Sequence, residues 1–307
     1  MTNIDLKDRK LLHSLYTNCR RSDRSIGNEI GQSKQLVHYR INNLEKRKVI
    51  LGYTIGIDKS KLGYQRFVVF FHFSHTTTLS EAIKHLRNFE QVSTLIECLG
   101  KWDLYATVWT KDHSDLYEFL QKLVTILDIE YWSVLAVVTS RMTLYQILND
   151  SPEKLPPKAP SSIIKINDID KKILDILKRN SREKLMNISR MVGLSMTAVR
   201  HRIKKLCNSG VIIRFFAGID MSKLGYQEIQ FLCNISPSKY TLIEEFTKHL
   251  EKNNRISYTL KTIGKWNICF SMYIKSQEEL RAFTKDVNAR FKELLINYDT
   301  LIIGHVV

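Results

Sequence analysis

The spacing of apolar residues predicts helices at the start of the chain. Three leucines share one face of the segment 8–19: Leu11, Leu12 and Leu15. A second stripe, at i, i+4 and i+7, marks the segment 34–46: Val37, Ile41 and Leu44. Between them, a short helix is expected over Ser25–Ile30, ending at Gly31, which can adopt the left-handed conformation. Ser33 is the expected N-cap of the following helix, so the sequence predicts a helix-turn-helix.

Polar and apolar residues then change period. Val49–Ile57 is typical of an extended strand, which we interpret as a wing beside the helix-turn-helix. Strand-like and helix-like segments alternate in the order βαββαβ over 66–73, 79–88, 92–99, 103–110, 114–127 and 130–138. That order predicts a ferredoxin-like domain, a four-stranded antiparallel sheet with two helices on one face.

The whole pattern occurs twice. Gly56–Gln65 returns as Gly218–Gln227 with one difference, at an offset of 162, and 24 of 58 aligned pairs from Asp8 to Gln65 are identical. LGKWD at Leu99–Asp103 matches IGKWN at an offset of 164. The predicted class is therefore α+β, with two tandem copies of a winged helix-turn-helix followed by a ferredoxin-like βαββαβ domain.

The two copies and their predicted elements set the expected domain boundaries. Copy one comprises a helix-turn-helix over 1–58 and a ferredoxin-like domain over 59–148; copy two comprises 166–220 and 221–307. A linker over 149–165 holds four of the five prolines, which favours semi-rigid polyproline II.

The cysteines and the apolar runs indicate the cellular compartment and the kinds of site that we expect. The five cysteines are scattered without a CxxC pair, which argues against a disulfide framework or a zinc site. We expect no cofactor and no metal. The chain has no apolar run of membrane-spanning length and starts without a signal-peptide pattern, so a cytoplasmic, nucleoid-associated protein is predicted.

The net charge of +16 is unevenly placed. Residues 1–58 hold 11 Lys and Arg against 6 Asp and Glu, and residues 163–220 hold 13 against 5. Solvated lysines spread evenly over a basic chain would not produce this concentration. The basic excess in both helix-turn-helix segments favours nucleic-acid binding.

Both copies resemble the leucine-responsive regulatory protein/AsnC family of transcription regulators. The resemblance rests on a motif series that copy two contains at family spacing: Asp170, Ile173, Leu174, Leu177, Val192–Ser195, Ala198, Val199, Arg202, Ile203, Leu206, Gly210–Ile212, Leu224 and Gly225. Copy one departs from it at Gln32 and Lys48. The resemblance implies a sequence-specific DNA-binding regulator that self-associates through its ferredoxin-like domains and is not an enzyme. The tandem fusion is unusual for a family whose chains hold one unit.

Recognition helices place outward residues in the major groove. Removing the inward positions leaves the predicted DNA-binding residues: Lys34, Gln35, His38, Tyr39, Asn42, Thr197, Arg200, His201, Lys204, Lys205 and the wing residue Arg214. Gln35 suits adenine and Arg200 suits guanine, whereas Lys204, Lys205 and Arg214 suit phosphate. Arg40 and Arg202 are expected to brace the domain or contact phosphate. Each of these residues alone could be part of a solvated helix face.

The resemblance also implies an amino-acid effector at the loop before the third strand. The matching positions are Gly100 and Asp103 in copy one and Gly264 and Asn267 in copy two. A carboxylate there could meet an amino group, and Asn267 lacks that charge. The alternative is structural, with each glycine forming a tight turn and each neighbouring Trp packing in the sheet interface.

Two other functions stay open. Siroheme decarboxylases resemble the same family and act as pairs of related subunits, so a fused pair would look similar. The residues that such an enzyme could use are His72, His75, His85, His113, Arg66 and Arg87. The second alternative, a nonspecific chromatin-type binder, would use the basic charge without reading bases.

Overall fold

The computed structural model describes residues 4–142, 146–148 and 162–306. The chain forms two compact units, and each unit combines a segment of copy one with a segment of copy two. The first unit comprises Met1–Gly63 and Leu144–Gly225 and contains both helix-turn-helix segments. The second comprises Tyr64–Thr143 and Tyr226–Val307 and contains both ferredoxin-like segments.

The first unit contains two three-helix groups. Head one is formed by α1 (Leu6–Asn18), α2 (Asp23–Ile30) and α3 (Lys34–Lys46); head two is formed by α6 (Asp168–Arg179), α7 (Leu185–Val192) and α8 (Met196–Asn208). The predicted turn chemistry is confirmed in both heads. Gly31 and Gly193 end the second helices with φ of 67°, and Ser33 and Ser195 cap the third through the backbone N–H of Leu36 and Ala198.

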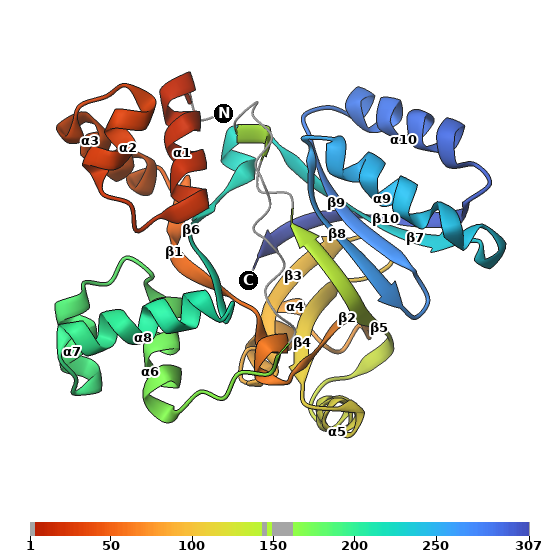
Figure 1. The fold of residues 1–307 in the computed structure, drawn as a ribbon. Helices are drawn as coiled ribbons and strands as arrows, with labels where there is room; N and C mark the ends of the chain where they lie inside the picture. The colour runs from red at the N-terminus through yellow and green to blue at the C-terminus, as the bar shows by residue number, and fades with distance from the viewer. Residues whose placement is uncertain (1–3, 143–145, 149–161, 307) are drawn as a thin grey trace. The chain divides into compact units, whose positions relative to one another are not determined.

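The predicted wing strands pair with each other. β1 (Ile50–Ile57) and β6 (Ile212–Ile219) form a two-stranded antiparallel sheet, with Thr54 opposite Phe216. Figure 1 shows the two strands running side by side along both groups of helices. The segments are extended as expected, but each one uses the other copy as its partner instead of forming a hairpin within its own copy.

This pairing also places a residue of copy one in the core of head two. Ile55 of β1 is buried in the apolar core of head two, together with Ile173, Leu177 and Val199. The backbone carbonyls of the strands accept hydrogen bonds across the copies in the same way: Cys19 N–H donates to Phe215 at 3.0 Å, and Ser181 N–H donates to Tyr53 at 3.0 Å. The two heads therefore form one folded body.

Cys19 and Ser181 occupy equivalent positions in the two copies and touch at the local symmetry axis. Both are fully buried, and the Cys19 Sγ lies 3.0 Å from the Ser181 Oγ. Burial raises the pKa of the Cys19 thiol. In a symmetric dimer, a residue near the two-fold axis contacts the same residue of the partner subunit. A contact between equivalent residues of the two copies is therefore expected where such a dimer interface has become intramolecular.

We expect Ser181→Cys to form an intrachain disulfide with Cys19 under oxidising conditions, because the two side chains already touch and a disulfide needs a closer approach of only about 1 Å. Peptide mapping without reductant detects this disulfide. The closed loop would be long, so the free energy of unfolding of the oxidised variant should rise by about 5 kcal/mol in the chain-entropy relation. The variant should therefore unfold at a higher denaturant concentration. Thr197→Cys, on an exposed helix face, is the matched control and should stay reduced; a free thiol at position 181 would contradict the predicted packing.

The second unit is a closed barrel of eight strands. Copy one supplies β2 (Gln65–Phe73), β3 (Val92–Leu99), β4 (Leu104–Thr110) and β5 (Ile129–Met142); copy two supplies β7 (Gln227–Ile235), β8 (Ile256–Ile263), β9 (Ile268–Ile274) and β10 (Leu295–Val306). The order around the barrel is β10-β3-β4-β2-β5-β8-β9-β7. Each copy keeps the predicted ferredoxin-like order, and the antiparallel pairs β5–β8 and β3–β10 join the two sheets.

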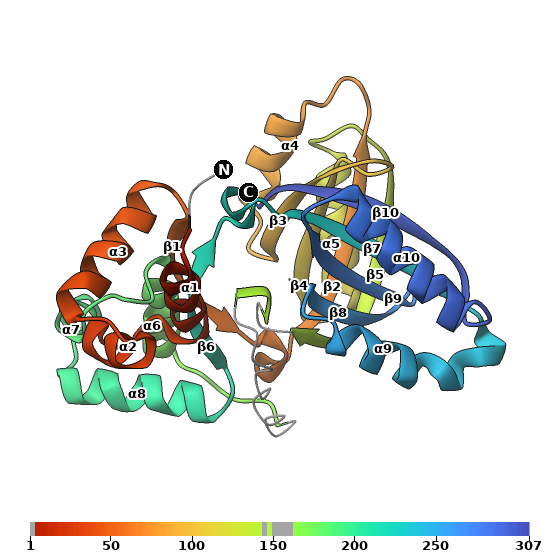
Figure 2. The same cartoon turned by 90° about the horizontal axis from the view of Figure 1, so that it is seen from above.

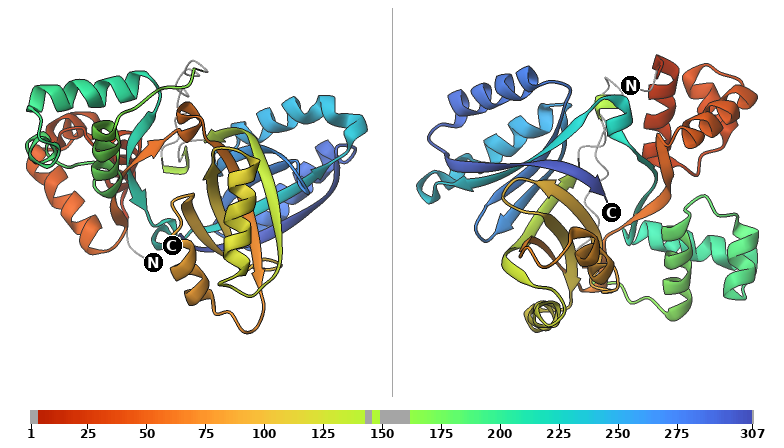
Figure 3. Two further views of the ribbon diagram at one scale, coloured as in Figure 1. Left: turned by 90° about the horizontal axis from the view of Figure 1, so that it is seen from below. Right: turned by 180° about the vertical axis from the view of Figure 1, so that it is seen from behind.

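The two faces of each sheet have different partners. Phe67, Val69 and Phe71 pack against the helices α4 (Leu79–Leu86) and α5 (His113–Val124), whereas Val68 and Phe70 join residues of copy two inside the barrel. Helices α9 (Ile243–Lys252) and α10 (Gln277–Phe291) cover the copy-two strands in the same way. Figures 2 and 3 show these helices on the outside of the strands. The continuous apolar run of β2 is explained by burial on both faces.

One polar cluster lies within the barrel. The Tyr258 hydroxyl donates to Gln230 and lies 3.3 Å from the Tyr105 hydroxyl, and Glu228 accepts from Ser271. Burial raises the pKa of Glu228 above the ordinary value of a glutamate. Ionisation of Glu228 is therefore less favourable in the folded chain than in water.

Glu228→Gln should stabilise the protein at pH 8 and have less effect at pH 5. Because the folded pKa of Glu228 lies above its unfolded value, the free energy of unfolding falls as pH rises through that interval, and a neutral Gln removes the loss. A gain of about 1 kcal/mol at pH 8 is expected, measured by urea titration at both pH values. Equal destabilisation at pH 5 and pH 8 would show that the carboxyl group is needed for packing instead.

The helix and strand segments predicted in copy one are found with ends shifted by a few residues; β5, for example, extends to Met142 instead of ending at 138. Residues 149–161 of the predicted linker lie outside the described residues, and the proposed domain boundaries stay a prediction. None of the helices in the described part of the chain is long and apolar enough to cross a membrane.

Candidate nucleic-acid interface

Each recognition helix is held by an arginine that joins it to the start of its head. In head one, Arg40 on α3 donates to Asp5 at 2.8 Å and to Asp8 at 2.7 Å. These two aspartates form the capping box of α1. The expectation that Arg40 braces the domain is thus supported by its contacts, since one guanidinium ties the N-terminus of the first helix to the middle of the third.

The same brace recurs in head two. Arg202 on α8 donates to Asp170 at 2.8 Å and to Asn167 at 3.3 Å, and those residues form the capping box of α6. The two recognition helices are therefore oriented by equivalent contacts, while their outward faces carry different side chains.

The outward faces of α3 and α8 are exposed. All of the predicted DNA-binding residues on these helices reach solvent: Lys34, Gln35, His38, Tyr39, Asn42, Thr197, Arg200, His201, Lys204 and Lys205. Tyr39 is the largest of them and is 66% exposed. The structure brings each set together on one helix face. Whether these side chains contact DNA stays a prediction.

Arg214 differs from this set because its side chain packs against aromatic residues. The wing strand that holds Arg214 is paired to β1, and its guanidinium lies 4.3 Å from the ring centre of Tyr16 and 4.4 Å from that of Phe216. Arg214 also donates to the Tyr16 hydroxyl at 2.8 Å. These contacts pack copy two against α1 of copy one, and phosphate binding by Arg214 stays a prediction.

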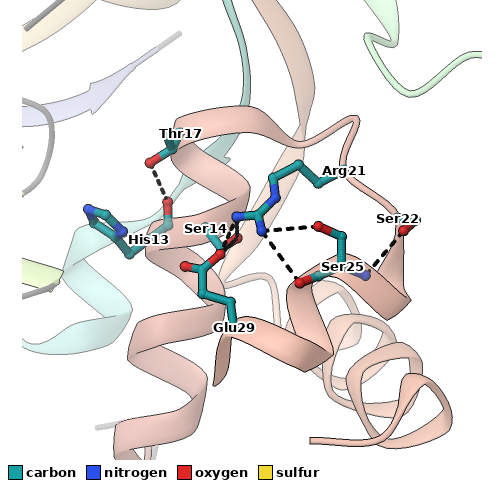
Figure 4. Close-up of polar contacts among 7 residues, drawn as sticks. All are labelled: His13, Ser14, Thr17, Arg21, Ser22, Ser25 and Glu29. Atoms are coloured by element: carbon teal, nitrogen blue, oxygen red, sulfur yellow. Dashed lines mark hydrogen bonds and ion pairs between the residues drawn. The ribbon is translucent and has the colours of Figure 1, made fainter. Parts of the chain in front are cut away.

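Head one has a polar cluster between α1 and α2 that sequence reasoning missed. Arg21 contacts Glu29 and donates to Ser14 at 2.9 Å and to Ser25 at 3.1 Å, as Figure 4 shows. Ser22 caps α2 through Ser25 N–H. The cluster sets the angle at which α2 leaves α1, and it depends on residues that are adjacent only after folding.

A second polar network crosses from copy two to head one. Arg182 donates to Asp23 at 3.2 Å and to the Tyr53 hydroxyl at 3.3 Å, and its guanidinium lies 4.9 Å from the Tyr53 ring centre. Tyr53 donates to Glu45 on α3 at 2.6 Å. Burial, with the Glu45 carboxylate, raises the pKa of Tyr53. Asp23 also lies 3.1 Å from the Nδ1 of His38.

The equivalent arginine of copy one makes a simpler contact. Arg20 donates to the Ser181 carbonyl at 2.7 Å and lies 5.5 Å from the Phe215 ring centre. Phe215 and Leu185 occupy the positions of Tyr53 and Asp23, so copy two has no hydroxyl or carboxylate there. The cross-copy contact is polar toward head one and mainly apolar toward head two.

The predicted effector loops have structural roles in both copies. Phe73 N–H donates to Asp103 at 2.9 Å, and Ile235 N–H donates to Asn267 at 2.9 Å. Both side chains thus complete the end of a strand, which Asn does as well as Asp. Trp102 and Trp266 are buried in the barrel interior, as the structural alternative predicted. Ligand binding by Gly100, Asp103, Gly264 and Asn267 stays a prediction.

The glycines of these loops are constrained to different degrees. Gly100 has φ of 136° and Gly264 has φ of 146°, both in the region that favours glycine. A methyl group at 264 would lie 2.7 Å from Leu135 Cδ2 and 2.8 Å from the Val134 carbonyl oxygen, whereas one at 100 would lie 3.3 Å from a Leu301 side-chain carbon.

Gly264→Ala should therefore destabilise the chain by about 3 kcal/mol, and Gly100→Ala by about 1–2 kcal/mol, the strain of a left-handed alanine alone. Guanidinium unfolding of the two variants checks the difference. Equal effects would mean that β5 moves enough around position 264 to accommodate the added methyl group.

The histidines considered for a decarboxylase lie on separate elements. His72 lies at the end of β2, with its Nδ1 3.0 Å from Asp103, His85 is on α4, and His113 starts α5 beside the Phe67 ring. Arg66 lies along the Trp109 ring. Within the described ranges, no group of three His, Cys, Asp or Glu side chains could hold a metal ion.

Comparison with known proteins identifies the heads. The AsnC-type helix-turn-helix domain matches residues 4–45 and 166–206. The chain is 35% identical over 121 residues to the HTH-type transcriptional regulator FL11 of Pyrococcus horikoshii, which covers 39% of this chain and 78% of that protein. It is 34% identical over 119 residues to the HTH-type transcriptional regulator Ptr1 of Methanocaldococcus jannaschii. That alignment covers 38% of this chain and 78% of Ptr1.

These matches define a protein with AsnC-type DNA-binding domains in both halves. The chain belongs to the Lrp/AsnC family of transcription regulators, of which it is a tandem form.

The tandem arrangement itself has a structural counterpart. The crystal structure of the siroheme decarboxylase NirDL aligns with a TM-score of 0.67 over 98% of this chain and 92% of that chain, at 15% identity. At that identity the similarity shows a shared fold.

Proposed function

We propose that this protein is a sequence-specific DNA-binding transcription regulator whose two heads read two different half-sites. The observation that carries the proposal is the pair of exposed recognition helices, oriented by the same arginine brace but presenting different side chains. The concentration of Lys and Arg in the two head segments supports DNA as the partner.

The chemistry of the two faces predicts the difference between the half-sites. Gln35 on α3 has an amide that suits adenine, and Arg200 on α8 has a guanidinium that suits guanine. Lys34, Lys204 and Lys205 suit phosphate, which fixes register without reading sequence. Since both heads are part of one chain, each molecule presents both faces, and we expect a bipartite operator that is not a palindrome.

The experiment is selection of bound genomic fragments by the purified full-length chain, followed by footprinting. Gln35→Ala should relax base preference in one half-site and Arg200→Ala in the other, each by about 1–3 kcal/mol. Lys205→Ala is the matched control, because loss of a phosphate contact should weaken all sequences alike and lower the salt dependence of binding.

Two results would contradict the proposal. Equal binding to all fragments would favour the nonspecific chromatin-type binder. Palindromic operators, with both variants affecting both half-sites, would mean that the two heads read the same bases.

An amino-acid effector is a finer proposal, inferred from the family resemblance. Asp103 is the first candidate to contact the amino group, because it is charged and its side chain is 38% exposed, whereas Asn267 is neutral. We further infer that the chain is not an enzyme. Its relatives are named as regulators, the siroheme decarboxylase is similar in fold alone, and the candidate histidines lie on separate elements.

A further inference from the structure

His38 is an exposed residue that is anchored at one ring nitrogen. Its side chain is 66% exposed, and its Nδ1 lies 3.1 Å from the Asp23 carboxylate, whose side chain is 14% exposed. Among the described residues, its Nε2 has no hydrogen-bond partner. The imidazole therefore lies on the outward face of α3 with one nitrogen held by the protein and the other available to a ligand.

Asp23 is itself held by copy two. Its other carboxylate oxygen, Oδ1, accepts a hydrogen bond from Arg182 at 3.2 Å. Arg182 is fixed in turn by the Tyr53 hydroxyl and ring. A carboxylate has no proton to donate and acts only as a hydrogen-bond acceptor. In a neutral imidazole beside it, the proton must then be on Nδ1, and Nε2 must be an acceptor.

We propose that His38 is a specificity-determining residue of head one, which reads a base amino group through Nε2, and that Asp23 and Arg182 are the positioning residues that fix its tautomer. The proposal rests on the proposed function. In the major groove the amino groups are cytosine N4 and adenine N6, whereas guanine and thymine present oxygen acceptors there. Head one should therefore prefer cytosine or adenine at one position and disfavour guanine and thymine.

Head two has the opposite polarity at the equivalent position. Arg200 replaces His38, and Leu185 replaces Asp23. A guanidinium has donors only, so head two should seek acceptors where head one seeks a donor. Because Arg182 belongs to copy two, base reading by head one also depends on the other half of the chain.

The tautomer of His38 can be measured without DNA. Long-range proton–nitrogen correlation spectra of the full-length chain at pH 8 distinguish the two neutral forms, and His38→Gln identifies the signal. The expected form has its proton on Nδ1. In Asp23→Asn, the amide oxygen can accept from Arg182 while the amide N–H donates to Nδ1, so the proton should move to Nε2. A wild-type His38 with its proton on Nε2 would overturn the proposal.

Base preference is measured by sequence selection at pH 8 with the wild type, His38→Ala, Asp23→Asn and Arg200→Ala. His38→Ala should lose the preference for cytosine or adenine at one position by about tenfold, and Asp23→Asn should reverse it toward guanine or thymine. Arg200→Ala, the matched control, should keep that position and change the other half-site.

The outcomes separate this proposal from the proposed function. Selective binding by the wild type, with the position unchanged in both His38→Ala and Asp23→Asn, would overturn the role of His38 alone. Unselective binding by the wild type would overturn both. Because Asp23→Asn removes an ionic contact to copy two, circular dichroism must show that it is folded, and His38→Ala, which leaves that contact intact, gives an independent result.

Discussion

The structure depends on one constraint, which is that neither copy can complete its own sheets. Within the parts of the chain that the structure describes, the strand after each helix-turn-helix pairs only with its counterpart, β1 with β6. Ile55 of copy one also fills the core of head two. The ferredoxin-like sheets would likewise end at β3, β5, β8 and β10 without the two seams that close the barrel. Unpaired strand edges expose backbone donors and acceptors, so association of the two copies is part of folding.

Placing both partners in one chain permits differences that a symmetric dimer cannot have. In a dimer of identical subunits, every substitution appears on both sides of the axis. Here Cys19 meets Ser181, and Thr54 lies opposite Phe216. The polar network of Arg182 exists on one side only. The same freedom applies to the recognition helices, where Arg200 stands in the place of His38.

Local chemistry could be predicted from the sequence, and non-local pairing could not. Gly31 and Ser33 determine the turn and the start of α3 through their own conformation and side chain, so α3 was predicted with its observed ends. The placement of Arg214 was missed because it depends on which strand lies next to β6. A wing hairpin and a cross-copy ribbon have the same alternation of residues, and only the register with β1 brings Arg214 to Tyr16. The Arg182 network was missed for the same reason.

The cross-copy constraint also explains which segment has changed least between the copies. Asp58 and Asp220 each accept a hydrogen bond at 3.0 Å, from the N–H of Ser60 and of Ser222. Their own N–H groups donate across the copies to Val211 and Val49.

Gly63 and Gly225 follow with φ of 84° and 80°, a conformation that other residues adopt at a cost. Several positions in this nearly identical segment therefore serve a cap, a left-handed turn or the partner copy. The outward residues of α3 and α8 serve none of these, because the inward stripe and the arginine brace already fix each helix. The heads could therefore diverge in what they read while the joint that aligns them stayed the same.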